Sequence, residues 1–239
     1  MDIVEYKNYL VDWLKKCVND SNTKGLIVGV SGGIDSALVA NLIKEAFPDN
    51  HLGVIIPIES ANEDVVDACE LVNACNIKHL QADLNDVYKE LLKIMEYDKN
   101  TTKSNLKARL RMIQLYALAS ENNYLVVGTD NKCEWYTGYF TKYGDGGVDI
   151  APLIHLDKLE VYEMAKIYNI PKSIIEKSPN AGLGSSLTDE EEMGVSYNTL
   201  CSYLKGKSID ENDKMIIEKL HNNSKHKRNG ITCPDKKYL

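Results

Sequence analysis

Apolar residues follow two spacings along this chain, and the two spacings alternate. Longer segments carry apolar residues three and four positions apart, which predicts amphipathic helices. These segments are Ile3–Val18, Ser36–Phe47, Asn62–Cys75, Leu84–Met95, Leu106–Ala119, Lys158–Tyr168 and Asp210–His221. Shorter apolar runs with turn-forming or polar neighbours predict buried strands. These runs are Leu26–Val30, Val54–Ile58, Ile77–Gln81 and Tyr124–Val127.

Strands that are separated by helix-length segments are typical of βαβ units. The pattern therefore predicts an α/β fold: a doubly wound, Rossmann-like parallel sheet flanked by helices. No internal repeat and no linker long enough to divide domains is visible, so a single domain is expected over residues 1–239. Ligands of such folds bind beyond the carboxyl ends of the strands.

Composition and charge narrow the classes of function. Hydrophobic residues make up 44% of the chain and charged residues 26%, which excludes a disordered or fibrous protein. The formal net charge of −7 argues against a protein that coats nucleic acid. No apolar run approaches the length of a membrane helix and the N-terminus does not resemble a signal peptide, so a cytoplasmic protein is expected. The six cysteines are scattered without a C-x-x-C pair, which favours reduced thiols.

A glycine-containing loop, Gly29-Val-Ser-Gly-Gly-Ile-Asp-Ser36, follows the first predicted strand. Its glycines let backbone N–H groups point into one concavity, and the next helix adds unpaired N-terminal donors. Ser31 and Ser36 add hydroxyl groups. Asp35 places a carboxylate beside this anion site, which suits Mg²⁺ held between the carboxylate and phosphates. The loop is neither a Walker A loop nor G-x-G-x-x-G, and a plain strand-to-helix turn is the alternative.

The loop resembles the pyrophosphate-binding loop of the N-type ATP pyrophosphatases, which have an adenine nucleotide alpha hydrolase-like fold. The resemblance implies that ATP is cleaved between its α and β phosphates. The loop would hold the departing pyrophosphate while an oxygen of the substrate takes AMP. The loop alone does not specify that substrate.

A second informative string, GTDNKCEWYTGYFTKYGDGGVDIAP, spans Gly128–Pro152 directly after the last predicted strand. Glu134 offers a second carboxylate for the metal beside Asp35. Lys142 is a lone cation among aromatic residues, which suits a ligand with flat rings and phosphates. A solvated loop above packed aromatic side chains is the alternative interpretation of such a string.

The complete string resembles the signature of NAD synthetases nearly throughout. Further matches to that family occur in the same order along the chain. They are Asn105–Met112, Leu156–Lys158, Ala181–Leu183, Thr188–Glu190, Met193–Tyr197 and His226–Arg228. The resemblance extends from about Gly29 to Arg228 and implies ATP-dependent amidation of deamido-NAD, the nicotinic acid dinucleotide.

The resemblance also implies roles for individual residues. ATP would be bound by Gly29, Val30, Ser31, Gly32, Gly33, Ile34, Asp35, Ser36, Thr129, Lys158 and Asn180. Deamido-NAD would be bound by Arg109, Lys142, Asp149, His226 and Lys227. Asp35 and Glu134 would hold Mg²⁺, and Asp149 is the candidate catalytic residue because it could orient or deprotonate ammonium. A homodimer is implied, with the active sites at its interface.

Some of these assignments need a choice. Arg109 and Arg111 stand two positions apart on a predicted helix, so at most one of them points into the site, and we choose Arg109. Asn180 stands where the family usually has Ser or Thr. The polar segment 178–192 is predicted to be a mobile lid, and Lys225–Arg228 begins a basic tail.

The reaction that the resemblance implies needs no protein nucleophile. The nicotinate carboxylate attacks the α-phosphorus of ATP, which gives an acyl-adenylate and pyrophosphate. Ammonia then attacks the activated carbonyl, and AMP leaves. Because the synthetase fold takes up the 239 residues and no cysteine has an amidase context, ammonia is expected as the direct nitrogen donor, free or from a separate subunit.

Two other functions compete with this interpretation. One is a tRNA-modifying pyrophosphatase, against which stand the acidic charge and the absence of persulfide-type cysteine pairs. The other is a nucleotide-binding regulatory sensor without catalysis. Such a sensor would need neither the second carboxylate at Glu134 nor a cationic set for another substrate.

Overall fold

The computed structural model describes residues 2–94, 97, 99–180 and 187–234. Its strands are β1 (Gly25–Gly29), β2 (His51–Ile55), β3 (His79–Gln81) and β4 (Tyr124–Val126). Its helices are α1 (Ile3–Asp20), α2 (Ile34–Ala46), α3 (Asn62–Ala74), α4 (Asn85–Ile94), α5 (Asn100–Asn122), α6 (Lys132–Thr137), α7 (Lys158–Ala165), α8 (Lys172–Ile175), α9 (Asp189–Met193), α10 (Tyr197–Leu204), α11 (Glu211–Asn223) and α12 (Lys225–Arg228).

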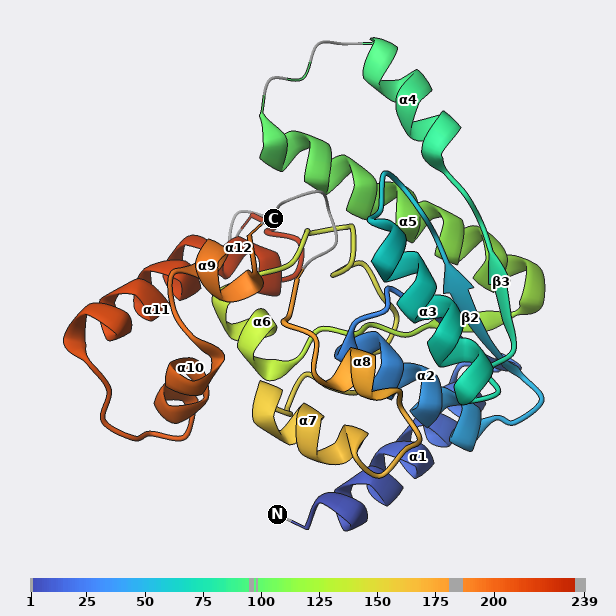
Figure 1. The fold of residues 1–239 in the computed structure, drawn as a ribbon, viewed down its shortest axis with the longest axis horizontal. Coiled ribbons are helices and arrows are strands. Elements are labelled where there is room, and N and C mark those ends of the chain that lie inside the picture. Colours follow the sequence, from blue (N-terminus) through green and yellow to red (C-terminus); the bar gives the residue numbers. More distant parts are fainter. Residues whose placement is uncertain (1, 95–96, 98, 181–186, 235–239) are drawn as a thin grey trace.

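The four strands form one parallel sheet in the order β3-β2-β1-β4. Side chains of β1 alternate between its two faces. Leu26 and Val28 join α1, α2 and α7 in the largest core cluster, whereas Ile27 joins the cluster that contains residues of α5. Helices thus cover both faces of the sheet (Figure 1). The predicted doubly wound α/β fold is confirmed.

The predicted strands are all present, but β2 lies earlier than the run Val54–Ile58. It begins at His51, a polar residue that the apolar pattern passes over. The imidazole of His51 is nevertheless buried, because its two nitrogens bond to the carbonyl of Phe47 and the N–H of Lys78. Hydrogen bonding therefore extends the strand beyond its apolar part.

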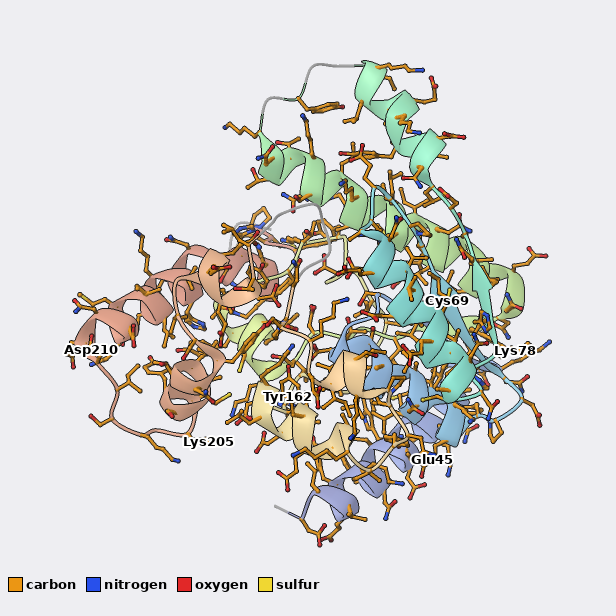
Figure 2. All side chains as sticks on the ribbon, in the orientation of Figure 1. Glu45, Cys69, Lys78, Tyr162, Lys205 and Asp210 are labelled. Atoms are coloured by element: carbon orange, nitrogen blue, oxygen red, sulfur yellow. The ribbon has the colours of Figure 1, made fainter. Side chains whose placement is uncertain are left out.

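Helix α2 is held from outside by α1 and by the connection after α7. Glu45, near the end of α2, accepts a hydrogen bond of 2.6 Å from the hydroxyl of Tyr168 and pairs with Lys7 of α1. Figure 2 places Glu45 beside α1, and Tyr162 on α7. The three helices form one layer that supports the loop at the start of α2.

A second group of helices lies beside the sheet, on the left of Figure 1. Helices α6, α9, α10 and α11 share a separate apolar cluster, which includes Cys133, Tyr197 and Ile217. The sequence pattern predicted no helix at α6, α8, α9, α10 or α12. These helices have only six, four, five, eight and four residues, too few for an apolar period to be recognised.

No helix within the described ranges is long and apolar enough to cross a membrane. All six cysteines lie in those ranges and none forms a disulfide. The sulfur atoms of Cys133 and Cys201 lie 3.7 Å apart inside the second helical group.

Gly25 at the start of β1 is a sensitive position of the sheet. A Cβ atom there would lie 2.0 Å from the carbonyl oxygen of Asn50 and 2.8 Å from the ring of Tyr124. We expect Gly25→Ala to lower the free energy of unfolding by about 1–3 kcal/mol, measured by urea denaturation. Gly230→Ala is the control because no atom lies within 4 Å of the added carbon. Equal stability of the two variants would contradict this account of the strand packing.

Candidate active site

A cavity opens beyond the carboxyl ends of β1, β2 and β4, where the fold predicts a ligand. It is lined by the loop after β1, by Ile56 and Pro57 after β2 and by Val127–Asp130 after β4. Ten of the eleven residues predicted to bind ATP line it, namely Gly29, Val30, Ser31, Gly33, Ile34, Asp35, Ser36, Thr129, Lys158 and Asn180. The remaining one, Gly32, turns the backbone instead.

Backbone geometry shows why the loop needs a glycine at position 32. Gly32 has a φ of 81°, and a Cβ atom there would lie 2.6 Å from the carbonyl oxygen of Asp64 at the start of α3. Gly33 does not adopt a positive φ; it is the N-cap of α2, which begins at Ile34, earlier than the predicted Ser36. Gly33 has no side chain with which to cap this N-terminus, so its N–H groups are available to an anion.

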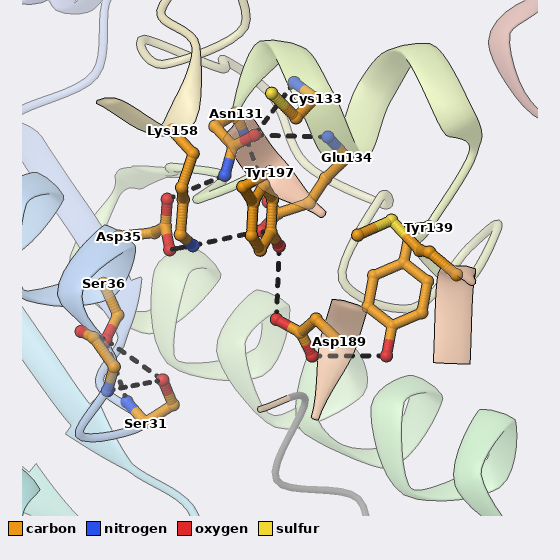
Figure 3. A network of polar contacts seen from close by, with 12 residues as sticks. Ser31, Asp35, Ser36, Asn131, Cys133, Glu134, Tyr139, Lys158, Asp189 and Tyr197 are labelled. Atoms are coloured by element: carbon orange, nitrogen blue, oxygen red, sulfur yellow. Dashed lines mark hydrogen bonds and ion pairs between the residues drawn. The ribbon is translucent and has the colours of Figure 1, made fainter. Parts of the chain in front are cut away.

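Two serines fix the shape of the loop. The hydroxyl of Ser36 donates to the carbonyl of Gly33 at 2.9 Å and lies 3.1 Å from the hydroxyl of Ser31. The N–H of Ser31 donates to the same Ser36 oxygen at 3.2 Å. Figure 3 shows these serines beside Asp35. The loop is therefore held in shape by its own side chains.

Asn131 connects this loop to the segment after β4. Its side-chain oxygen caps α6 by accepting from the N–H groups of Cys133 and Glu134, and its own N–H donates to Glu134 Oε2 at 3.0 Å. This arrangement is a capping box. The side-chain NH₂ of Asn131 donates to Asp35 Oδ1 at 2.9 Å. One fully buried residue thus orients both predicted metal ligands.

Lys158 lies between the same two carboxylates (Figure 3). Its Nζ is 2.5 Å from Asp35 Oδ2 and 3.5 Å from Glu134 Oε1, and only 2% of its side-chain surface is exposed. Burial lowers the pKa of Lys158, but the two carboxylates more than reverse this effect, and the pKa lies above its usual value. The lysine is therefore a permanent cation of the site.

When both carboxylates are ionised, the pair carries more negative charge than Lys158 neutralises. Burial and the neighbouring Asp35 raise the pKa of Glu134 to about 8, although Lys158 opposes them. Within the described part of the chain no three His, Cys, Asp or Glu residues form a metal cluster. Two carboxylates beside an anion loop are nevertheless the protein ligands typical of Mg²⁺, since substrate phosphates and water complete its shell. The residues therefore fit Mg²⁺.

The residues predicted to bind deamido-NAD lie outside the lining of this cavity. Arg109, Lys142 and His226 form a separate group that is joined through backbone carbonyls: Arg109 donates to the carbonyl of Lys142 at 3.3 Å, and Lys142 Nζ donates to the carbonyl of His226 at 2.7 Å. Lys227 Nζ donates instead to the carbonyls of Gly138 and Phe140. The binding role of this group is still a prediction.

Asp149 stands apart from that group. Its carboxylate accepts from the hydroxyl of Tyr116 at 3.0 Å and from the N–H of Val126 at 2.7 Å. These contacts tie the segment after the Gly144–Gly147 turn to α5 and β4. The predicted chemical role of Asp149 is untested.

The choice of Arg109 over Arg111 does not agree with the cavity. Arg111 lines it, and its Nε and Nη2 donate to the carbonyl of Ile56 at 3.1 Å and to the hydroxyl of Ser60 at 3.2 Å. Arg109 is exposed on the other side of the helix. As expected from their spacing, only one of the two arginines points into the cavity.

The predicted mobile segment 178–192 is described only in part, because residues 181–186, with the family match Ala181–Leu183, lie outside the described ranges. Ser178, Pro179 and Asn180 line one side of the cavity, and so does Asp189. The mobility of the segment remains a prediction.

The predicted basic tail is partly a helix, α12, that fastens α6. Arg228 donates to the carbonyls of Trp135, Tyr136 and His221, and Ser224 Oγ donates to the carbonyl of Thr137 at 3.0 Å. Gly138 must be a glycine here, since a Cβ would lie 2.1 Å from Ser224 Cβ. Ser224 and Arg228 are therefore anchored against α6, whereas Lys225 and His226 are exposed.

Sequence reasoning missed four residues of this region: Asn131, Arg111, Asp189 and Tyr197. Asn131 had a readable signal, because Asn-x-x-Glu before a helix is a capping-box pattern. Tyr197 and Asp189 stand in family-matching segments, but their roles could not be predicted, since Tyr197 joins Glu134 and Asp189 across segments far apart along the chain.

Comparison with known proteins places this site in a family. The family model described as NAD synthase matches residues 6–231. A curated relative, the NH3-dependent NAD+ synthetase of Alkaliphilus oremlandii, is 51% identical over 230 residues, which cover 92% of each chain. The chain belongs to the NAD synthase family. The resemblance read from the motifs is thereby confirmed.

Solved structures of two proteins resemble the whole chain. The structure of NMN synthetase from Francisella tularensis is 40% identical with a TM-score of 0.94, covering 98% of this chain and 99% of that one. The NH3-dependent NAD synthetase of Campylobacter jejuni, in complex with a nitrate ion, is 28% identical with a TM-score of 0.83, at 98% and 100% coverage. The α/β fold of the NAD synthase family therefore extends over nearly all of this chain.

Asn131→Ser separates the two tasks of Asn131. Serine keeps an oxygen that caps α6, but it cannot donate to Asp35 from the same position. We expect the free energy of unfolding to fall by less than about 1 kcal/mol. The affinity for ATP with MgCl2, measured by calorimetry, should fall about tenfold because Asp35 loses its orientation. Asn131→Asp, which faces Asp35 with a third carboxylate, should weaken binding further. Unchanged ATP affinity in both variants would contradict the role given to Asn131.

Proposed function

We propose that this chain is an ammonia-dependent NAD synthetase: a ligase that forms the carboxamide of NAD from deamido-NAD, with ATP converted to AMP and pyrophosphate. One observation carries the proposal. The uncapped start of α2, Asp35 and Glu134 meet at one cavity, in a member of the NAD synthase family. The name of the Alkaliphilus relative supports ammonia as the nitrogen donor.

The first step is formation of an acyl-adenylate. The nicotinate carboxylate attacks the α-phosphorus, and the bond to the β-phosphate breaks. The N–H groups at the start of α2 and the hydroxyls of Ser31 and Ser36 hold the leaving pyrophosphate. Lys158, next to Asp35, adds a fixed positive charge that stabilises the charge developing on the phosphates.

Asp35 and Glu134 would hold Mg²⁺, which supplies charge neutralisation of the phosphates when bound. In the second step ammonia attacks the activated carbonyl and AMP leaves. No protein nucleophile takes part, so catalysis depends on positioning and on electrostatics.

Family membership also motivates a homodimer; light scattering that gave a mass near the 26.8 kDa of one chain would contradict it.

A second candidate substrate has its own support. The likeness to the NMN synthetase of Francisella is closer than the likeness to the Campylobacter NAD synthetase. The corresponding reaction would amidate nicotinic acid mononucleotide by the same chemistry. It needs no site for the adenosine half of a dinucleotide.

The function is tested by supplying ATP, MgCl2 and ammonium with either deamido-NAD or nicotinic acid mononucleotide, and by measuring NAD, NMN and AMP by mass spectrometry. We expect NAD and AMP in equal amounts, and little product when glutamine replaces ammonium. Asp35→Asn should lower turnover at least about 100-fold because the phosphates lose a charged partner, whereas the exposed Asp86→Asn is the control.

Each alternative gives another outcome in this assay. NMN as the main product would favour the mononucleotide. AMP formed only with added tRNA would indicate a tRNA-modifying enzyme, and nucleotide binding without AMP would indicate a sensor. The absence of pyrophosphate release with every reactant present would overturn the proposal.

Asp149→Asn tests whether Asp149 acts on ammonium. Asparagine can still accept from the N–H of Val126 and donate to the hydroxyl of Tyr116, so the variant should fold normally. If Asp149 orients or deprotonates ammonium, turnover at saturating ammonium falls about 100-fold. Wild-type turnover would leave Asp149 a purely structural residue. The melting temperature checks the fold.

A further inference from the structure

The hydroxyl of Tyr197 stands between two acidic side chains from different elements. It lies 3.2 Å from Glu134 Oε1 and 3.2 Å from Asp189 Oδ2, and Tyr197 is only 4% exposed (Figure 3). The tyrosine is the first residue of α10, whereas Glu134 belongs to α6 and Asp189 begins α9. The three helices meet at this one oxygen.

Asp189 continues the connection toward the nucleotide side of the cavity. Its backbone N–H donates to the carbonyl of Pro179 at 3.1 Å, which brings together the chain on both sides of residues 180–188. Its other carboxylate oxygen accepts from the hydroxyl of Tyr139 at 3.2 Å. Asn180, next to Pro179, lines the cavity. Asp189 thus joins the chain that carries Asn180 to Tyr197.

We propose that Tyr197 is a positioning residue of the reaction: its hydroxyl donates to Glu134 until a cation binds there and then donates to Asp189, which contacts the segment that carries Asn180. The proposal rests on the function proposed above. It assigns to the hydroxyl of Tyr197 a task in the binding of ATP with Mg²⁺, beyond the packing of its ring.

The single hydrogen of the hydroxyl explains how this link works. A phenol donates to one acceptor at a time, so Tyr197 serves either Glu134 or Asp189. When Glu134 faces a cation, the hydroxyl is free to donate to Asp189, which is fixed at the same time by its bond to Pro179. Cation binding at Glu134 therefore strengthens the contact between Tyr197 and Asp189, which supports the segment that carries Asn180. Nucleotide binding strengthens cation binding in return.

The ring of Tyr197 has a separate role that the experiment must keep. Lys158 Nζ lies 4.9 Å from the ring centroid, so the ring contacts the charged group of Lys158. The ring also packs in the second apolar cluster. Phenylalanine preserves this ring and removes only the hydroxyl. Tyr203 offers a matched control on the same helix, because its hydroxyl contacts Tyr136 and Glu218, away from the cavity.

The test is calorimetric titration with α,β-methylene-ATP, which is not cleaved at its α–β bond, in excess MgCl2 and again in EDTA. We expect Tyr197→Phe to weaken binding about tenfold in MgCl2 and to leave it unchanged in EDTA, since the hydroxyl acts through the cation ligand. Tyr203→Phe should match the wild type in both buffers. Equal weakening in both buffers, or none, would overturn the proposal.

Asp189→Asn gives a second measurement, and thermal melting checks that each variant folds. The double variant should bind no more weakly in MgCl2 than the weaker single variant, because the two side chains act in one chain of contacts. If the fold-losses of affinity in the two single variants multiplied in the double variant, Tyr197 and Asp189 would act independently, and the proposed link between them would be wrong. The titration needs no turnover, so the result is independent of whether the wild type forms NAD, NMN or neither.

Discussion

One ammonium group facing two carboxylates governs the architecture of this site. Lys158, Asp35 and Glu134 come from the starts of α7, α2 and α6, and all three are largely withdrawn from water. Charges in such a place are tolerated only when they are paired and hydrogen-bonded, so the loss of one partner leaves the others at a high energetic cost. The helices must therefore begin at fixed positions relative to one another, and these positions determine the shape of the cavity.

The same hydrogen bonds serve the fold and the chemistry. Asn131 begins α6 by capping it, and its remaining donor holds Asp35 on the neighbouring loop. The hydroxyls of Ser31 and Ser36 shape the loop in the protein alone and face the place where phosphates would bind. Because these groups are already in position, the ligand need not organise them, which lowers the entropic cost of binding.

Local signals carried most of the sequence-based prediction. The strand runs, the glycine loop and the family string each depend on neighbouring residues, and the fold and family they imply are confirmed. Contacts between distant segments were not readable. Nothing in the spacing of Arg109 and Arg111 tells which one faces the loop after β2, and Tyr197 meets Glu134 only because α10 packs on α6. The early start of β2 at His51 likewise depends on hydrogen bonds that an apolar pattern does not record.

The fastening of α6 by the end of the chain sets an order of events during synthesis. Lys227 donates to the carbonyl of Gly138, a residue that precedes it by 89 positions. At common translation speeds the ribosome needs on the order of ten seconds to add that many residues. During this interval the glycine loop and the four strands are already synthesised, while the turn after α6 still lacks its contact with Lys227. A nascent chain can thus form the loop after β1 before its second half is secured, and premature termination would leave that half without its anchoring contacts.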